Sequence, residues 1–330
     1  MDTLTHALSG ALLARATAPK DAPPRSLPRR VAAGFFACAA PDLDFVIGFV
    51  GPVEYLLTHR GVTHSLILLP AWALLYSWIL AKILREPGGW RALYGVTAAA
   101  LLVHIVGDLI TSFGTMILAP FSDWRAALGT TFIIDLWFSG IILAGLVFSV
   151  IFFKSRVPAV AATVALAGYV GFQYVQKQRA LELGIEYAKS MGMEKARTTG
   201  RGWTVFVSDE ETHRFAHVNL VRKEPRRYRP GDGFIARIDS PYMPLEQVIW
   251  VARTRYGKAD QALIREAWNS DALAFFRWFA DLPAFDGLGE GSSCVWFTDL
   301  RFLTPGRETM PFRYRVCRSR PGAPWRLAIS

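Results

Sequence analysis

Thiols and acidic side chains are scarce in this chain of 330 residues. It has three cysteines, none of them in a C-x-x-C spacing, which argues against a zinc site built from thiolates. Acidic residues number 27 against 37 basic ones, for a formal net charge of +10. The sequence also lacks helix-turn-helix, zinc-finger and RNA-recognition signatures, so we expect no nucleic-acid partner. We attribute the basic balance to loops beside anionic lipid head groups.

A cleavable signal peptide is another feature that the sequence does not show. The first residues, MDTLTHALSGALLARA, carry an acid where a signal peptide has basic residues, and their apolar stretch is short. Asp2 or Thr3 is suited to cap a short helix there. Residues 18–30 are rich in proline and basic side chains, which predicts a loop.

Apolar residues, by contrast, are abundant and unevenly distributed. The chain is 52% hydrophobic, and Ala, Leu, Val, Ile, Phe and Trp dominate residues 31–175. Four runs approach the ~20 residues needed to cross hydrocarbon, and they are residues 65–84, 92–113, 131–153 and 157–175. A fifth run, 31–50, is interrupted by P-D-L-D. We therefore predict that residues 1–175 form an α-helical membrane domain with four to five transmembrane helices.

The remaining residues, 176–330, have the mixed composition of a soluble domain. The segments 203–207, 214–221, 294–302 and 312–318 alternate like strands, and DQALIREAW and DALAFFRWFADL are amphipathic like helices. We predict a small α+β domain. Cys294 and Cys317 lie on two of these strands and can pair if the domain lies outside the cytoplasm. His213 and His217 have no acidic partner at metal spacing, so we expect them to be surface histidines.

Basic residues mark one side of the predicted spans. They lie before the first span, between the second and third, and between the fourth and fifth: Arg15, Lys20, Arg25, Arg29, Arg30, Lys82, Arg85, Arg91, Lys154 and Arg156. The opposite loops, 51–64 and 114–130, carry only Arg60 and Arg125. Since positive loops stay in the cytoplasm, we expect a multi-pass protein of the bacterial inner membrane whose C-terminal domain lies on the outer, periplasmic side.

Imidazoles and carboxylates gather in the apolar half. His104 and Asp108 form an H-x-x-x-D pair, whose side chains project from one face of a helix. Ionisable groups inside a span cost ~2.5–3.5 kcal/mol each, and a buried His–Asp hydrogen bond explains this pair as well as a metal ion does. Further candidate ligands lie in the same half: His6, Asp42, Asp44, His59 and His64. So many groups favour a shared divalent cation, and ligands of this kind suit zinc or manganese, as one ion or two.

Five motifs follow one another in the first half of the chain. They are L-T-H at 4–6, P-D-L-D at 41–44, H-R-G-V-T-H-S at 59–65, H-x-x-x-D at 104–108 and P-F-S-D at 120–123. Together they resemble the YdjM-like family of inner-membrane proteins, which are described as metal-dependent hydrolases, and the resemblance covers about residues 1–155. It implies as ligands His6, one or both of Asp42 and Asp44, His64, His104 and Asp108, with His59 as a ligand or the neighbour of one.

A more distant resemblance concerns the order of these histidines and aspartates. It is similar to that of zinc-dependent phospholipase C and P1-type nucleases, which implies a helical metal site that cleaves phosphoester bonds. The sequence departs from the family pattern at I-I-D, 133–135, where Leu136 stands in place of the expected proline. We therefore expect Asp135 at most to orient a ligand.

These observations favour a membrane-bound hydrolase, in which metal-activated water attacks a phosphoester or similar bond of a lipid-borne substrate. We expect whichever of Asp42, Asp44 and Asp108 is not bound to metal to act as general base. Arg60 is a candidate to hold a phosphate oxygen, or else an arginine whose guanidinium reaches the membrane interface.

Two other functions remain open from the sequence. The polar groups can line an ion path, although the inner-leaflet segments 70–81 and 141–153 are nearly all apolar, which disfavours transport. They can also stabilise a scaffold whose C-terminal domain recruits a partner. In each case we expect membrane lipids among the partners.

Overall fold

The computed structural model describes residues 1–19, 26–193, 195–199, 203–258, 260–289, 293–307 and 310–328. The chain divides into two compact units, Met1–Val175 (unit 1) and Gln176–Ser330 (unit 2). The predicted loop over 18–30 ends earlier than expected, because helix already begins at Ser26. Two of the basic residues used to predict orientation, Lys20 and Arg25, lie outside the described residues.

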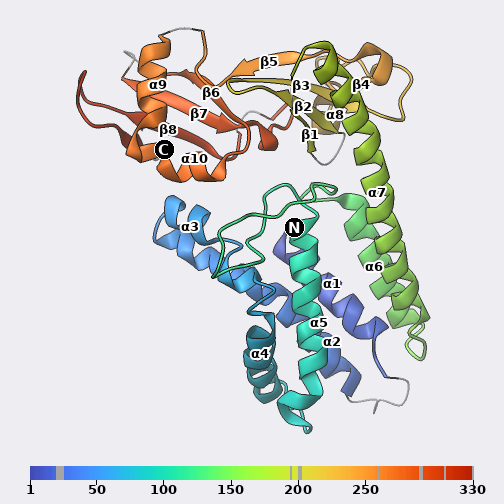
Figure 1. Ribbon diagram of the computed structural model, residues 1–330. Helices are drawn as coiled ribbons and strands as arrows, with labels where there is room; N and C mark the ends of the chain where they lie inside the picture. Colours follow the sequence, from blue (N-terminus) through green and yellow to red (C-terminus); the bar gives the residue numbers. More distant parts are fainter. Residues whose placement is uncertain are drawn as a thin grey trace. The chain divides into compact units, whose positions relative to one another are not determined.

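Unit 1 is built from helices (Figure 1). In chain order they are α1 (Thr3–Ala16), α2 (Ser26–Ala39), η1 (Ala40–Phe49), α3 (Pro52–Thr58), η2 (Val62–His64), α4 (Leu69–Ile83), α5 (Gly89–Leu109), α6 (Leu136–Ile151) and α7 (Val157–Ser190), the last of which continues past Val175 into unit 2. The carboxylate of Asp2 accepts a hydrogen bond from the backbone N–H of Thr5, so Asp2 is the N-cap of α1.

Three stretches of helix are long and apolar enough to cross a membrane: Ser26–Phe49, Gly89–Leu109 and Val157–Ser190. A fourth candidate is the pair Pro52–His64 and Leu69–Ile83, which is bent by 83° at its break. α6 is apolar too but has only 16 residues, because the Asp135 carboxylate caps it at the run's polar end. The prediction of a helical membrane domain is confirmed, with three to four candidate spans among the described residues.

Close backbone contact joins α1 to α2. A Cβ added to Gly10 would lie 2.2 Å from the carbonyl oxygen of Gly34, and one added to Gly34 would lie 2.5 Å from that of Gly10. Only glycine allows this approach, as in other membrane helix pairs. Both helices also pack against α5, and α4 packs on the same helix (Figure 1). Residues of α1 and α2 therefore reach the face of α5 that carries His104.

Unit 2 combines two antiparallel sheets with short helices, which confirms the predicted α+β class. The first sheet contains β1 (Lys195–Thr199), β2 (Thr204–Ser208), β3 (Thr212–Asn219), β4 (Met243–Pro244) and β5 (Val251–Thr254), with only β4 parallel to its neighbour. The second has the order β6 (Pro283–Leu288), β7 (Cys294–Asp299), β8 (Arg313–Cys317) and β9 (Arg326–Ala328). The helices are α8 (Phe234–Asp239), α9 (Gln261–Asn269) and α10 (Ala274–Phe279), with 3-10 turns η3 (Leu245–Gln247), η4 (Asp271–Leu273) and η6 (Leu300–Phe302).

A disulfide bond links the second sheet across two neighbouring strands. Cys294 on β7 lies opposite Cys317 on β8 in the strand register, and their Cα atoms are 4.0 Å apart. The third cysteine, Cys38, is a free and fully buried thiol in the core formed by α1, α2, α4 and α5.

Candidate metal centre

Four of the predicted ligands converge in unit 1. Asp42 comes from η1, His64 from η2, and His104 and Asp108 from the last turns of α5. One ligand atom from each lies within 4.8 Å of the others, and all four residues are buried. The P-D-L-D break is what allows this, because the chain winds into a 3-10 helix there and carries the carboxylates to the end of α2.

The spacing of these atoms fits a single small cation. Nε2 of His64 is 2.9 Å from Nε2 of His104 and 3.2 Å from Oδ2 of Asp108. Nε2 of His104 is 3.5 Å from the same oxygen of Asp108. Oδ1 of Asp42 lies 3.7 Å and 3.6 Å from the two histidine nitrogens. Ligands held tetrahedrally at ~2.0–2.1 Å from zinc are separated by about 3.3 Å. The observed distances scatter around that value.

Hydrogen bonds fix which nitrogen of each imidazole faces the centre. Nδ1 of His104 lies 2.6 Å from the carbonyl oxygen of Cys38, so it carries the proton and donates. The hydroxyl of Thr63 donates to Oδ2 of Asp44, at 3.1 Å, and therefore accepts from Nδ1 of His64 at 2.8 Å. Both rings therefore turn Nε2 toward the centre.

The two Nε2 atoms lie 2.9 Å apart beside two carboxylates, an arrangement that a cation bound between them would stabilise. The unsatisfied oxygens agree with this, since Oδ2 of Asp42 and of Asp108 are buried and accept no hydrogen bond from the described residues. Buried polar atoms are nearly always paired, so these orphans indicate a missing partner. The donor set of two imidazoles and two carboxylates suits zinc.

The outer oxygen of Asp108 is held by three donors. Its Oδ1 lies 3.0 Å from Nε2 of His6, 2.9 Å from Nη2 of Arg60 and 2.5 Å from the amino group of Met1. The ring of His6 also stacks on that of His104 with centroids 3.9 Å apart. These contacts orient Asp108 from the side away from the four ligand atoms, in the way that neighbours of metal ligands commonly do.

Arg60 lies inside the protein, with 2% of its surface exposed. Besides Asp108 it reaches Oγ1 of Thr111 through Nη1, at 3.0 Å. The prediction that the guanidinium of Arg60 reaches the membrane interface is therefore wrong. The phosphate contact stays a prediction, although the described hydrogen bonds commit the guanidinium to protein groups.

Asp44 and His59 belong to the loop around the centre. Oδ1 of Asp44 lies 2.8 Å from Nδ1 of His59, and its Oδ2 accepts from the backbone N–H of Arg60 and from Thr63. Both oxygens are therefore occupied. Neither residue joins a candidate ligand group within the described part of the chain. Asp44 instead shapes the 58–64 loop that presents His64.

A second candidate group shares one ligand with the first. It contains His6, Cys38 and His104, all buried. The thiol of Cys38 lies in the core cluster of α1, α2, α4 and α5. The hydrogen bond from Nδ1 of His104 to the Cys38 carbonyl leaves that nitrogen without a free lone pair. The four-residue group is therefore the better cation site.

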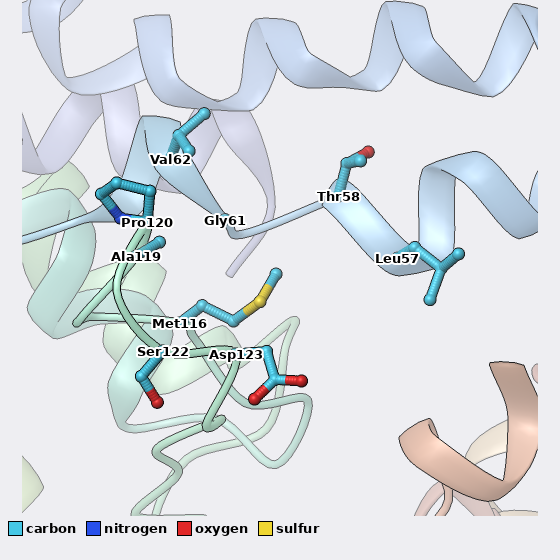
Figure 2. A pocket seen from close by; sticks show the side chains of 9 residues that line it. All are labelled: Leu57, Thr58, Gly61, Val62, Met116, Ala119, Pro120, Ser122 and Asp123. Carbon is cyan, nitrogen blue, oxygen red and sulfur yellow. The ribbon is translucent and has the colours of Figure 1, made fainter.

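An open pocket of about 240 Å³ lies beside the same loop (Figure 2). Its lining comes from the segments 57–62 and 116–123 and is mostly apolar: Leu57, Gly61, Val62, Met116, Ala119 and Pro120, with Thr58, Ser122 and Asp123 as polar members. The two segments are joined where the N–H of Met116 donates to the carbonyl of Arg60, at 2.9 Å. One wall of the pocket is thus the loop that carries His59, Arg60 and His64.

Two more residues singled out from the sequence, Asp135 and His213, make hydrogen bonds that stabilise the fold outside the centre. Asp135 caps α6 through Oδ1 and accepts from the hydroxyl of Tyr169 through Oδ2, at 2.8 Å. His213 is buried, with Nδ1 2.8 Å from Oγ of Ser208 and Nε2 3.0 Å from the carbonyl oxygen of Pro283. The expectation of a surface histidine is wrong at this position, because β3 turns this side chain toward β6.

Three contributors to the centre carried no signal that we used. They are the carbonyl of Cys38, the hydroxyl of Thr63 and the hydroxyl of Thr111. A backbone carbonyl has no sequence signature, and the sequence assigned no role in the centre to the hydroxyl of Thr63 inside the H-R-G-V-T-H-S motif. Ser65, close to it, forms a turn before α4, since its Oγ accepts from the N–H groups of Ile67 and Leu68.

Comparison with known proteins places the centre in a recognised context. The family model described as YdjM inner membrane protein matches residues 1–180. A similar curated protein is the uncharacterized protein YfhP of Bacillus subtilis (strain 168), which is 31% identical over 133 residues, or 39% of this chain. The chain spans 40% of the length of that relative. No solved structure matches the chain.

Proposed function

The chain belongs to the YdjM inner membrane protein family, and from this premise and the geometry of the centre we propose that it is a membrane-bound, metal-dependent hydrolase. The observation that carries the proposal is the convergence of two imidazole Nε2 atoms and two carboxylates at the spacing of ligands around a tetrahedral ion. The ion is zinc, with manganese as the alternative, and one ion fits the four ligands.

The residues of the centre then have different roles. A bound divalent ion supplies Lewis-acid activation of water and of the scissile bond. Asp42 would hold the ion through Oδ1, which leaves Oδ2, free of described partners, to accept a proton from water. Arg60 and His6 hold Asp108 in place. We therefore assign Arg60 a positioning role and not a contact to phosphate.

A lipid-borne phosphoester is the substrate class that the surroundings favour. The apolar pocket shares the 58–64 loop with the centre, so it can hold a hydrocarbon part while a polar head lies at the metal. The candidate spans keep this region at a bilayer.

Metal analysis of detergent-purified full-length protein tests the centre. We expect about one zinc per chain in the wild type and its loss in His64→Ala and in His104→Ala. His59→Ala and His217→Ala are the matched controls, since neither histidine is in the four-ligand group, and both should keep the metal. Equal zinc content in all five proteins would refute the site.

Activity is tested separately, with bis(p-nitrophenyl) phosphate and with phosphatidic acid in mixed micelles. We expect hydrolysis that depends on added zinc or manganese and that falls at least ~10²-fold in His64→Ala. Zinc retention without hydrolysis of either probe, or of a wider panel of phosphoesters, would reject the enzymatic proposal while leaving the metal site intact.

Burial favours a second candidate, a metal site that only stabilises the fold. His64, His104 and Asp108 are fully buried, and Asp42 is 8% exposed. Structural metal sites are closed in this way, whereas catalytic sites keep an open position. If this candidate is correct, chelation should lower the melting temperature while no probe is hydrolysed.

We also propose that the protein crosses the membrane several times and that unit 2 lies on its periplasmic side. Arg60 and Arg125, the two basic residues of the outer loops, are bound internally, Arg125 to the carbonyls of Leu56 and His59, which sharpens the charge asymmetry. The disulfide of unit 2 is typical of an oxidising compartment.

A membrane-impermeant maleimide tests this topology on intact spheroplasts. A cysteine introduced at the exposed Ser319 of unit 2 should react before lysis, and one at the exposed Arg85 only after lysis. The reverse pattern would invert the orientation.

A further inference from the structure

The segment between β3 and α8 in unit 2 is an exposed loop with an unusual composition. Residues 221–235, which we call the β3–α8 loop, read V-R-K-E-P-R-R-Y-R-P-G-D-G-F-I. Every residue from 223 to 235 is exposed, and no helix or strand forms before Phe234. The loop has five basic residues against two acidic ones. The metal centre and the pocket beside it use none of them.

Large apolar side chains are interleaved with these charges. The exposed fractions are 79% for Val221, 46% for Tyr228, 60% for Phe234 and 69% for Ile235. Single exposed apolar residues are ordinary, but four within fifteen positions of a basic loop form a mixed surface. Basic heads with apolar neighbours are the composition of segments that lie in a membrane interface.

The structure holds the two ends of the loop together. The side chain of Asn219, at the end of β3, accepts from the N–H groups of Val221 and Arg222. Arg222 and Arg226 both pair with Asp239 at the end of α8. The loop is therefore a closed excursion, anchored at its base by Asp239.

A turn shapes the middle of the loop. The N–H of Arg229 donates to the carboxylate of Asp232, and the N–H of Asp232 donates back to the carbonyl of Arg229, at 2.8 and 2.9 Å. Gly231 has a φ of 97°, which glycine adopts without strain. The turn lies between Tyr228 and Phe234, so the aromatic side chains flank it on both sides.

We propose that the β3–α8 loop binds the head-group region of an anionic lipid bilayer. Lys223, Arg227 and Arg229, which do not pair with Asp239, meet lipid phosphates, and Val221, Phe234 and Ile235 enter the boundary between head groups and acyl chains. Charge complementarity supports a lipid, because phospholipid head groups present phosphate at both faces of a bilayer. The spans of the same chain tether unit 2 to a bilayer, which keeps the local lipid concentration high.

A lipid-quenching experiment on the full-length chain tests this binding. Ile235→Cys introduces one accessible thiol, since Cys38 is buried and the other two cysteines form a disulfide. The protein is labelled with bimane and placed in nanodiscs of phosphatidylcholine, with or without phosphatidylglycerol, that contain spin-labelled lipid. We expect strong quenching and a blue shift in the anionic discs. The same label at exposed Ser319 should show neither.

Charge reversal separates a lipid contact from mere proximity. Lys223→Glu, Arg227→Glu and Arg229→Glu together should weaken loop binding by roughly a hundredfold and abolish the quenching. The matched control reverses three exposed arginines outside the loop, Arg253, Arg320 and Arg326, with the same change in net charge, and should leave the quenching unchanged. Equal loss in both triple variants would overturn the proposal.

Amide hydrogen exchange of the unsubstituted protein gives a result that does not depend on any variant. Residues 223–235 should exchange fast in phosphatidylcholine discs and become protected in discs with phosphatidylglycerol. Fast exchange in both discs would overturn the proposal, and so would protection that is independent of lipid charge, since that indicates a protein partner on the loop.

Discussion

Two carboxylates at neighbouring positions have different partners. Asp42 faces His64 and His104 and keeps a buried oxygen without a described partner. Asp44, two residues later, uses both oxygens to hold the 58–64 loop. A 3-10 helix turns by about 120° per residue, so residues two apart point to different sides. The winding of η1 therefore separates a ligand from a loop anchor.

Asparagine at each position tests this division. We expect Asp42→Asn to reduce zinc affinity by about 10²-fold or more, because a ligand charge is lost. Asp44→Asn should keep the zinc but loosen the loop, since Thr63 and His59 lose a charged acceptor. Zinc affinity by competition with a chromophoric chelator measures the first effect, and hydrogen exchange of residues 58–64 measures the second. Similar zinc affinities in the two variants would contradict the assignment.

The residue types at the centre were predictable from the sequence, but their roles were not. Spacing alone suggested His104 with Asp108, and the family motifs added the others. Whether His6 binds metal or holds Asp108 depends on which oxygen of Asp108 it meets, and only the packing of α1 on α5 decides that. The burial of Arg60 had the same cause, because its neighbours are 51 and 48 positions away in sequence, at Thr111 and Asp108.

At the scale of elements, the contact between α1 and α2 positions the centre. Gly10 and Gly34 leave no room for a side chain, and the same pair of helices carries His6 and the Cys38 carbonyl to α5. The geometry of the centre thus depends on a contact that is made by backbone atoms.

Gly10→Ala should therefore disturb both stability and metal binding. Its Cβ would meet the Gly34 carbonyl and the Cys38 Cβ, at 2.2 and 2.4 Å, so the helices must separate. Overpacking of this kind costs about 1–3 kcal/mol, which should appear as a lower melting temperature in detergent and a lower zinc content. The control is Gly95→Ala on α5, where a Cβ meets nothing within 4 Å. That variant should equal or exceed the wild type in stability.

Each predicted span contains a helix, but the ends differ, and α6 is too short to be a candidate span. The apolar run 65–84 gives a helix only from Leu69, because Ser65 and its hydrogen bonds form a turn first. The run 131–153 gives a helix only from Leu136, after the Asp135 cap. Hydropathy measures where a chain is apolar, whereas the start of a helix depends on caps and turns within that stretch.

At the scale of the whole molecule, unit 2 should respond to acid through its buried histidines. Burial lowers the pKa of His217 from 6.5 to about 4, and it also lowers the pKa of His213. Below pH 6.5, His217 of the unfolded chain therefore binds a proton, whereas His217 of the folded chain stays neutral until about pH 4. Stability is fully present above pH 6.5 and falls as the pH drops through this window, by about 1–3 kcal/mol for His217.

Hydrogen exchange of β2 and β3 as a function of pH measures this effect after correction for intrinsic rates. His217→Gln, which can still bond to Thr204, should reduce the loss of protection between pH 6.5 and 4. The remaining slope belongs to His213 and should vanish in the double variant. An unchanged slope in His217→Gln would show that this histidine does not contribute.

The division into helical and mixed parts was visible in composition, because a bilayer demands long apolar helices and water does not. The topology of the two sheets was not visible. Strand order depends on pairings such as Thr212 with Thr254, which lie far apart in the sequence. The alternation of apolar and polar residues describes each strand by itself and does not say which strand is its neighbour.

The hydrogen bond from His104 to the backbone of position 38 has a consequence for variation along the family. The backbone carbonyl of position 38 can accept this hydrogen bond whatever side chain the residue carries. Position 38 is thus free to change its chemistry while its volume stays restricted by the packing of α2 on α1, where a Cβ added to Gly10 would lie 2.4 Å from the Cβ of Cys38. Alanine and serine are tolerable replacements there, and a lineage can discard the oxidisable sulfur without losing the tautomer on which the imidazole depends.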